Sequence, residues 1–431
     1  MSYPAAKIGS MIISSTAIAT QRSTAIKQLA PALSVTTPVL GVVDFNVLDQ
    51  LIEQLGEAYP EPWLHHMVGV DTVRLPGVLE HFRARGFGAQ TRSAAELQIA
   101  NQTGFQLHEL LHSAGVNSLV LLNQLVHAGM NLSIDNFVEL SRVDELIEDP
   151  KELTAKFGLR VTAQAPVDDE EPTVSYRGIG LRDHRKEIIQ AYADRPWLNH
   201  LQLHFDPAPA TLQQAAEHVA EIFRLAEDID HAADAQRIYG IHISGGLPVN
   251  YDSDDVAPTM ETYRFVLQAM TPELFDGKYT VTTNFAPALT AKAGLILARV
   301  EYIKDLGGRM IAVTHAEDPV GCSQPNQPIR VEAYDAHGDY NDGIELFYYD
   351  IAGPHGILRH RVELPELEEG DILAILDVGG TAFSAQATFT APVYGIRADG
   401  LLTETSVLHR GRSAEETAEA AGIYQPVKLL D

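Results

Sequence analysis

Short apolar runs alternate with amphipathic segments along the chain from residue 37 to about residue 290. "GFGAQT" precedes "AAELQIANQTGF", and "LNHLQLHFD" precedes the long segment "TLQQAAEHVAEIFRLAEDI". Apolar residues recur every three or four positions in that last segment, which predicts one apolar helix face. Strands that alternate with helices over this length favour a parallel sheet with crossover helices, and in particular a β/α barrel.

The pattern changes after about residue 300. Strand-like runs such as "RMIAVTHA", "IELFYYDIAG" and "GDILAILDVGG" follow one another, with Gly, Pro and Asp turns between them. The sequence therefore predicts an α/β fold, in which a (β/α)8 TIM-like barrel over residues 37–295 precedes a C-terminal all-β domain over residues 296–431. Residues 1–36 are expected to add a strand to the β-domain.

Composition narrows the choice of partner. A chain of 431 residues fits two domains. Its formal net charge of -27 argues against nucleic acid and against an anionic membrane surface as partners. The single cysteine excludes an intrachain disulfide, and no run approaches the ~20 apolar residues of a membrane span. We expect a soluble cytoplasmic protein.

Four longer motifs occur in a characteristic order. They are "GFGAQTRSAAELQIANQTGF", "GMNLSIDNFVELSRVDEL", "IHISGGLPVNY" and "AGPHGILRHRVELPELEEGDILAILDVGGTAFS". Together they resemble the fold-type III pyridoxal-phosphate decarboxylases, the diaminopimelate and ornithine decarboxylase group, over roughly residues 37–420. The resemblance implies the barrel with its β-domain and a head-to-tail homodimer.

The resemblance fails where the family's cofactor chemistry lies. The family's catalytic lysine aligns with Asp71, and the sequence has no lysine between Lys27 and Lys151. A carboxylate cannot form the Schiff base on which pyridoxal-phosphate chemistry depends. The acid that the family places at the pyridine nitrogen aligns with Asn284. We therefore expect no cofactor, with pyridoxal phosphate disfavoured and a His/carboxylate metal site as a remote alternative that no local signature supports.

Other family positions also differ. His355 and His360 lie in the loop that, in the family, reaches the partner subunit's active site. There Gly356 aligns with the family's cysteine, His360 with its aspartate, and Thr381 further on with its tyrosine. Arg177 lies near a family strand end and could bind a substrate carboxylate or form a surface ion pair. The segment Ser244, Gly245 and Gly246 still has the composition of a phosphate-binding loop.

Four residues are the candidates for catalysis. Asp71, His204 and His242 lie at or near predicted strand ends, where β/α barrels build their active sites. Carboxylates and imidazoles there can act as general acids and bases. His355 is expected to approach from the second subunit. Each has a structural alternative, because Asp is favoured as a helix cap and histidines pack in cores.

Three functional hypotheses follow. The first is an enzyme that works without pyridoxal phosphate on an amino-acid-derived small molecule. The second is an inactive pseudo-enzyme that binds a metabolite or regulates a partner decarboxylase. The third is a residual pyridoxal-phosphate-dependent amino-acid decarboxylase. The histidines predicted at the strand ends favour the first.

Overall fold

The computed structural model describes residues 13–163, 176–205, 211–317, 330–380, 382–383, 389–399 and 402–420. These residues form two compact units. The first contains Leu51–Asn250 and Asp255–Leu289, and the second contains Ile13–Gln50, Tyr251–Asp254 and the described residues from Thr290 onwards.

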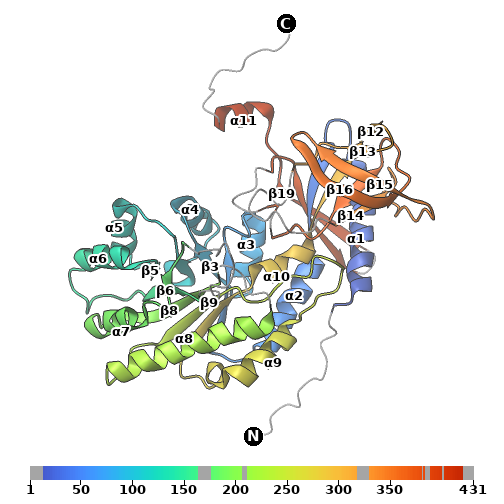
Figure 1. Ribbon diagram of the computed structural model, residues 1–431. Helices are drawn as coiled ribbons and strands as arrows, with labels where there is room; N and C mark the ends of the chain where they lie inside the picture. The colour runs from blue at the N-terminus through green and yellow to red at the C-terminus, as the bar shows by residue number, and fades with distance from the viewer. Residues whose placement is uncertain are drawn as a thin grey trace. The chain divides into compact units, whose positions relative to one another are not determined.

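The first unit is a closed barrel of eight parallel strands, with helices on the outside of the strands (Figure 1). Around the ring the strand order is β2-β3-β4-β5-β6-β8-β9-β10, and the short β7 adds to β6. The strands are β2 (Leu64–Gly69), β3 (Gly88–Thr91), β4 (Leu110–His112), β5 (Asn131–Ile134), β6 (Phe157–Thr162), β7 (Ile179–Gly180), β8 (Leu198–His204), β9 (Gly240–Ser244) and β10 (Thr280–Asn284). The predicted barrel is confirmed.

Helices connect these strands. They are α3 (Pro76–Arg83), α4 (Ala94–Gln102), α5 (Leu119–His127), α6 (Phe137–Leu146), α7 (Arg185–Asp194), α8 (Leu212–Ala232) and α9 (Met260–Met270). The apolar stripe expected in α8 is buried, including Val219, Ile222 and Phe223. Burial of such a stripe against the strands is the main source of a surface helix's stability.

Two of the strand–helix loops are closed by the same capping arrangement. Ser93 accepts a hydrogen bond from Glu96 N, and the Glu96 carboxylate in turn accepts one from Arg92 N at 2.7 Å. Asn136 and Glu139 repeat this at the start of α6, where Glu139 accepts from the backbone of the preceding loop. This reciprocal pattern is similar to a capping box, except that the carboxylate accepts from the residue before the N-cap, and it fixes the path of the chain from strand into helix.

The second unit contains two sheets. The larger has the order β14-β17-β11-β1-β18-β19, and the smaller has the order β12-β13-β15-β16. The strands are β1 (Val39–Asp44), β11 (Gly294–Arg299), β12 (Tyr302–Asp305), β13 (Met310–Val313), β14 (Val331–Tyr334), β15 (Leu346–Gly353), β16 (Gly356–Pro365), β17 (Ile372–Ile375), β18 (Val393–Asp399) and β19 (Leu402–His409). The predicted C-terminal β-domain is confirmed.

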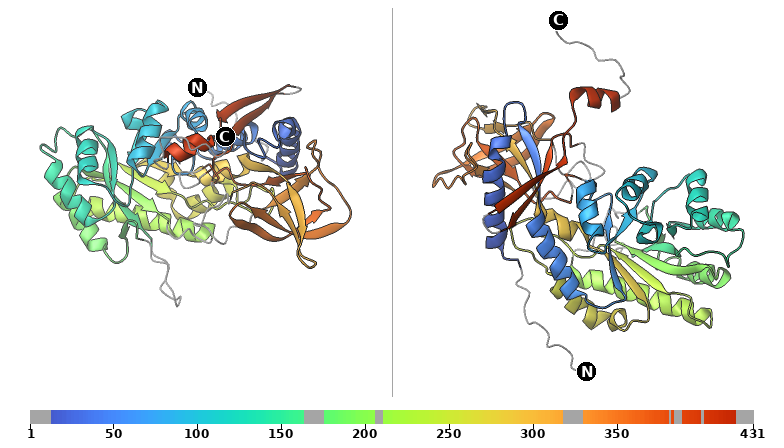
Figure 2. Two further views of the ribbon diagram at one scale, coloured as in Figure 1. Left: turned by 90° about the horizontal axis from the view of Figure 1, so that it is seen from above. Right: turned by 180° about the vertical axis from the view of Figure 1, so that it is seen from behind.

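Two sequence-based expectations about the N-terminal part are wrong. The expected N-terminal strand is instead the helix α1 (Ser15–Leu29), which packs Ala25, Ile26 and Leu29 against the large sheet (Figure 2). The run Val39–Asp44 pairs with β11 and β18 in that sheet, so it is not a barrel strand. A buried strand has the same apolar pattern in either setting, which is why sequence alone did not separate them. The exact domain boundaries stay a prediction.

The remaining helices are α2 (Phe45–Ala58), α10 (Ala286–Thr290) and α11 (Ala414–Ala420). Within the described residues, no helix combines the length and apolar character that crossing a bilayer requires.

Candidate functional site

The strands of the barrel terminate at one end, here called the mouth. Asp71 lies two residues beyond β2, and Arg92 lies one residue beyond β3. Arg92 Nη1 and Asp71 Oδ2 are 2.6 Å apart, and both side chains are largely buried. Asp71 is therefore the anionic half of an ion pair that joins the ends of two neighbouring strands.

The local backbone explains how Asp71 reaches this position. A Cβ atom placed on Gly69 would lie 2.3 Å from Asp71 Oδ1, so no other residue fits at position 69 without moving that carboxylate. Asn284 Nδ2 would lie 3.5 Å from the same point. The carboxylate thus turns back over the end of β2, towards the end of β10, instead of capping a helix. Helix α3 begins later, with Leu75 at its N-cap position.

His204 ends β8 and is only 6% exposed. Its Nδ1 atom is buried without a hydrogen-bond partner among the described residues. Burial, and then the positive charges of Arg160, Arg92 and Arg177, lower the pKa of His204 to about 3. The imidazole is therefore neutral at physiological pH, and its environment is positively charged.

A chain of hydrogen bonds crosses the barrel interior below the mouth. Arg160 donates to Ser113 at 3.1 Å, and Ser113 donates to Gln202 at 2.6 Å. Gln202 donates to Ser244 at 3.1 Å, and Ser244 donates to Gln90 at 3.1 Å. Five strands thus contribute to one network, which holds these side chains in fixed orientations.

Both ends of this network are anchored. Arg160 Nε donates to the buried Asp135 at 2.8 Å, and Asp135 also accepts from Gly178 N. At the other end, Asn284 donates to Gln90 at 2.8 Å. The side-chain amide of Asn284 thus makes a hydrogen bond within the protein. It places a hydrogen-bond donor where the related decarboxylases are expected to have an acid.

In the loop Ser244–Gly246, some of the groups that could bind an anion already make hydrogen bonds within the protein. Gly245 N donates to the carbonyl of Asn284 at 3.0 Å, and the Ser244 hydroxyl belongs to the interior network. Gly246 has φ of +98°, and a Cβ there would lie 2.6 Å from the Tyr263 hydroxyl, so a glycine is required.

His242 lies deeper than expected. It precedes Ser244 by two residues on the same face of β9, and its Nε2 is 3.2 Å from Ser244 Oγ. Burial lowers the pKa of His242 to about 3. Its side chain lines a cavity among the beginnings of the strands, at the end of the barrel opposite the mouth.

Of the remaining candidates, Arg177 acts on the mouth through its charge, which contributes to the low pKa of His204, whereas no described contact brings His355 or His360 there. Arg177 donates to the Tyr176 hydroxyl at 3.0 Å and lies over that ring. His355 is exposed in the β15–β16 turn, and His360 lies 3.3 Å from Asp350 in β15. Thr381 lies outside the described residues. A role for each stays a prediction.

Sequence reasoning missed Arg92, Arg160, Gln90 and Gln202. A signal was present, because polar residues occupy every second position of several barrel strands. The inward-facing positions of β8, β9 and β10 are His200, Gln202, His204, Gly240, His242, Ser244, Thr280, Thr282 and Asn284. Barrel interiors are ordinarily filled by branched apolar residues, so this alternation indicates a polar interior.

The comparisons agree with the fold. A family model described as "Pyridoxal-dependent decarboxylase, pyridoxal binding domain" matches residues 63–287, which is more than half of the chain. The diaminopimelate decarboxylase of Archaeoglobus fulgidus is 23% identical over 372 residues, covering 80% of this chain and 84% of that protein. The Aquifex aeolicus enzyme of the same name is 22% identical over 388 residues, with 84% and 86% coverage.

Solved structures give the same result. The Helicobacter pylori diaminopimelate decarboxylase, in a complex with L-lysine, has a TM-score of 0.74 at 17% identity, covering 92% of this chain and all of that one. The M. jannaschii enzyme, also with L-lysine, has a TM-score of 0.76 at 16% identity, with 93% and 94% coverage.

These findings correct the expectation about the cofactor. The matched model is a pyridoxal-binding domain, and the relatives are diaminopimelate decarboxylases, so the family evidence points to pyridoxal phosphate. The expectation that no cofactor is used is therefore wrong. The family assignment itself is confirmed, and the chain belongs to the pyridoxal-dependent decarboxylases.

Proposed function

We propose that the mouth of the barrel binds pyridoxal phosphate without a covalent link to lysine, and binds an amino-acid-derived substrate beside it. The observation that carries the proposal is the Asp71–Arg92 ion pair at the position expected for the catalytic lysine. The sequence has four lysines between residues 51 and 289, which are Lys151, Lys156, Lys186 and Lys278. None of the four follows the end of a barrel strand.

The described residues fit such a non-covalent ligand. Three buried polar atoms near the ends of β3, β6 and β8 lack partners among the described residues, namely Gln90 Nε2, Thr162 Oγ1 and His204 Nδ1. Buried polar groups are normally hydrogen-bonded, so unpaired ones in a concave site favour a missing ligand or water. The positive charges of Arg92, Arg160 and Arg177, which already act on His204, favour an anion such as a phosphate ester.

The roles follow from these positions. Bound pyridoxal phosphate would supply an electron sink for the loss of a carboxylate. His204 offers a neutral imidazole to stack on a planar ring or to accept a proton at Nδ1. Asp71 offers a carboxylate to hold a substrate ammonium group. Arg92 pairs with that carboxylate at 2.6 Å and fixes its orientation.

A second candidate function is a ligand-binding protein without turnover. Burial holds the pKa values of both His204 and His242 at about 3, far from the neutral range in which a general base is most effective. This observation favours a pseudo-enzyme that binds a metabolite or regulates a partner decarboxylase, as a homodimer or with that partner.

The test is a titration of the protein with pyridoxal phosphate by calorimetry, followed by borohydride reduction and mass spectrometry. We expect saturable binding and no mass added to any lysine. Asp71→Lys provides the matched comparison, because it restores a lysine and should become labelled on reduction. Absence of binding, or a labelled lysine in the wild-type chain, would contradict the proposal. Turnover of meso-diaminopimelate, L-ornithine or L-arginine separates the enzyme from the pseudo-enzyme.

A further inference from the structure

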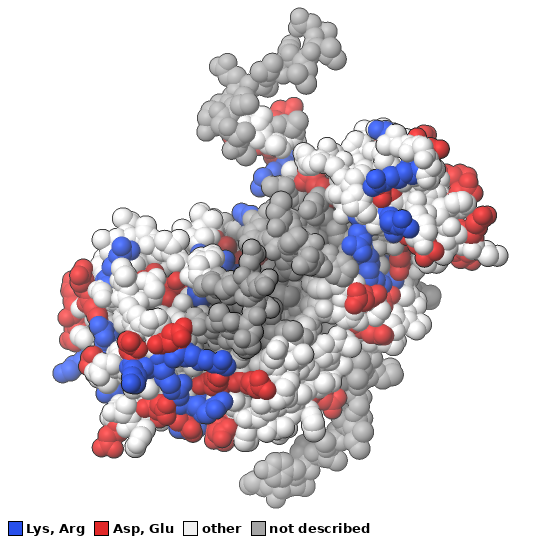
Figure 3. All heavy atoms as spheres, in the orientation of Figure 1, with Lys and Arg blue, Asp and Glu red and all other residues white. Residues whose placement is uncertain are grey.

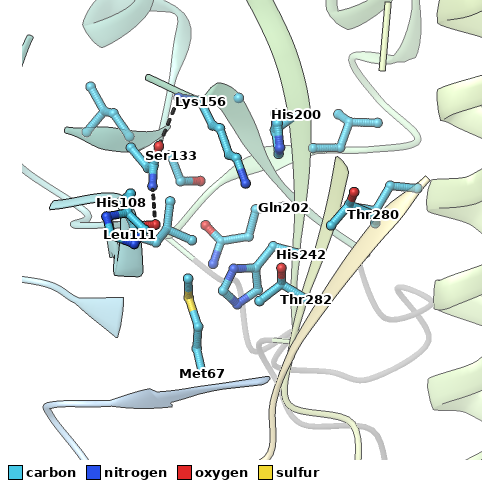
Figure 4. Close-up of a pocket in the computed structure, with 15 residues that line it drawn as sticks. Met67, His108, Leu111, Ser133, Lys156, His200, Gln202, His242, Thr280 and Thr282 are labelled. Atoms are coloured by element: carbon cyan, nitrogen blue, oxygen red, sulfur yellow. Dashed lines mark hydrogen bonds between the residues drawn. The ribbon is translucent and has the colours of Figure 1, made fainter. Parts of the chain in front are cut away.

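The cavity that His242 lines lies among the beginnings of the barrel strands. His108 precedes β4, Lys156 precedes β6, and Thr280 begins β10, and all three line it (Figure 4). It offers about 60 Å³ to the centres of water-sized molecules. One water needs roughly 10–15 Å³ by this measure, so the cavity accommodates on the order of four water-sized groups. In an ordinary barrel this space is packed with branched apolar side chains.

The wall of this cavity has no acidic side chain among its described lining residues, although the whole chain carries 58 Asp and Glu against 31 Lys and Arg. The side chain of Lys156 extends over the cavity towards His200 and Gln202 (Figure 4). Burial, followed by the positive charge of Lys156 and by His242, lowers the pKa of His200 to about 3. Lys156, which is exposed, is the one Lys or Arg side chain among the described lining residues.

The wall also contains an unused hydroxyl group. Ser133 is only 3% exposed, and its Oγ has no hydrogen-bond partner among the described residues. Both polar atoms of the Asn131 side chain, by contrast, already make hydrogen bonds within the protein. Its Oδ1 accepts from Lys156 N, and its Nδ2 donates to the carbonyls of His108 and Leu110. The structure therefore leaves the buried Ser133 hydroxyl available to a group bound in the cavity.

The hydrogen bonds of Ser244 determine which ring nitrogen of His242 carries the proton. Ser244 has one hydroxyl proton, which it donates to Gln90, and it accepts from Gln202. The contact between Ser244 Oγ and His242 Nε2 is then made by a proton on Nε2. His242 Nδ1 is left as a hydrogen-bond acceptor, so the cavity can bind a group that both donates and accepts.

We propose that this cavity is a second binding site, separate from the mouth, for a small monoanionic carboxylate of one or two carbons. Bicarbonate and acetate represent the class. Four heavy atoms match the volume, and one negative charge matches the one ammonium group of Lys156. The phosphate dianion carries more negative charge than this one ammonium group balances. Bicarbonate also has the hydroxyl proton that His242 Nδ1 can accept.

Binding can be measured with the full chain at pH 7.5 by 13C NMR, using labelled acetate and labelled bicarbonate in separate titrations. We expect saturable line broadening with both, and tighter binding of bicarbonate because of its additional donor. Lys156→Met should weaken binding at least about tenfold, and Ser133→Ala should weaken it more modestly. Lys186→Met, which removes an exposed lysine from α7, should have no effect.

Two results would overturn the proposal. One is the absence of saturation by either anion in the wild-type chain. The other is equal affinity in the wild-type, Lys156→Met and Ser133→Ala chains, with circular dichroism confirming that all are folded. Pyridoxal-phosphate affinity serves as the internal check, because Lys156→Met should leave it unchanged if the cavity and the mouth are separate sites.

Discussion

Asp71 has the clearest consequence at the scale of single residues. Asp71→Asn keeps the shape of the side chain and removes the charge that pairs with Arg92. If this carboxylate holds a substrate ammonium group, affinity for the amino-acid substrate or turnover should fall at least about tenfold, equivalent to ~1.4 kcal/mol. Pyridoxal-phosphate affinity should stay the same or rise, because Arg92 is released to attract anions.

Calorimetric titrations of the wild-type and variant chains check this, with melting temperature as the measure of stability. Asp228→Asn is a suitable control, because it removes an exposed ion pair with Arg185 on the barrel helices. Such surface pairs contribute little to stability. Unchanged affinity and turnover in Asp71→Asn would mean that the residue serves only the structure.

At the scale of elements, the inward face of β9 predicts acid sensitivity. Burial lowers the pKa of His242 from its ordinary value of 6.5 to about 3. The unfolded chain therefore binds a proton between these values that the folded chain does not, so folding stability falls as pH decreases from about 6.5 towards 3. Above pH 6.5 this contribution is constant.

Urea unfolding between pH 3.5 and 8 measures this effect. The wild-type chain should lose stability below about pH 6.5, and His242→Gln should lose less, because glutamine keeps a polar group beside Ser244 but cannot be protonated in this range. Parallel curves for both chains would contradict the burial of a neutral imidazole at this position.

The elements also show what sequence can and cannot predict here. The alternation of strands and helices predicted the barrel well, because this signal is local. The strand Val39–Asp44 was placed in the wrong sheet, since its pairing with β11 depends on residues more than 250 positions away. Arg92 was missed for a similar reason, because its contact with Asp71 exists only once β2 and β3 are adjacent.

At the scale of the whole molecule, the assembly is the main expectation still open. The turn that carries His355 is exposed, and in the related decarboxylases it is expected to complete the neighbouring subunit's pocket. We expect a homodimer, and multi-angle light scattering at micromolar concentration measures it. A stable monomer would refute this and would also remove the partner-regulation hypothesis.

Surface charge bears on the other expected partners. On the face drawn in Figure 3, basic side chains lie among acidic ones and form no uninterrupted basic patch in the described part of the chain. The pairs Arg182–Glu221 and Arg185–Asp228 are local examples. Binding to nucleic acid requires clustered positive charge, so this face offers no support for such a partner.

The capping carboxylates Glu96 and Glu139 allow the mouth to change its chemistry. They hold the loops after β3 and β5 through hydrogen bonds within the protein: Glu96 accepts from Arg92 N, and Glu139 accepts from Asp135 N and from the Asn117 side chain. A mutation at the mouth can then alter reactivity without loss of the scaffold. In evolutionary terms, the fold can outlast the reaction for which it was first selected, and a new activity can arise in it by one substitution at a time.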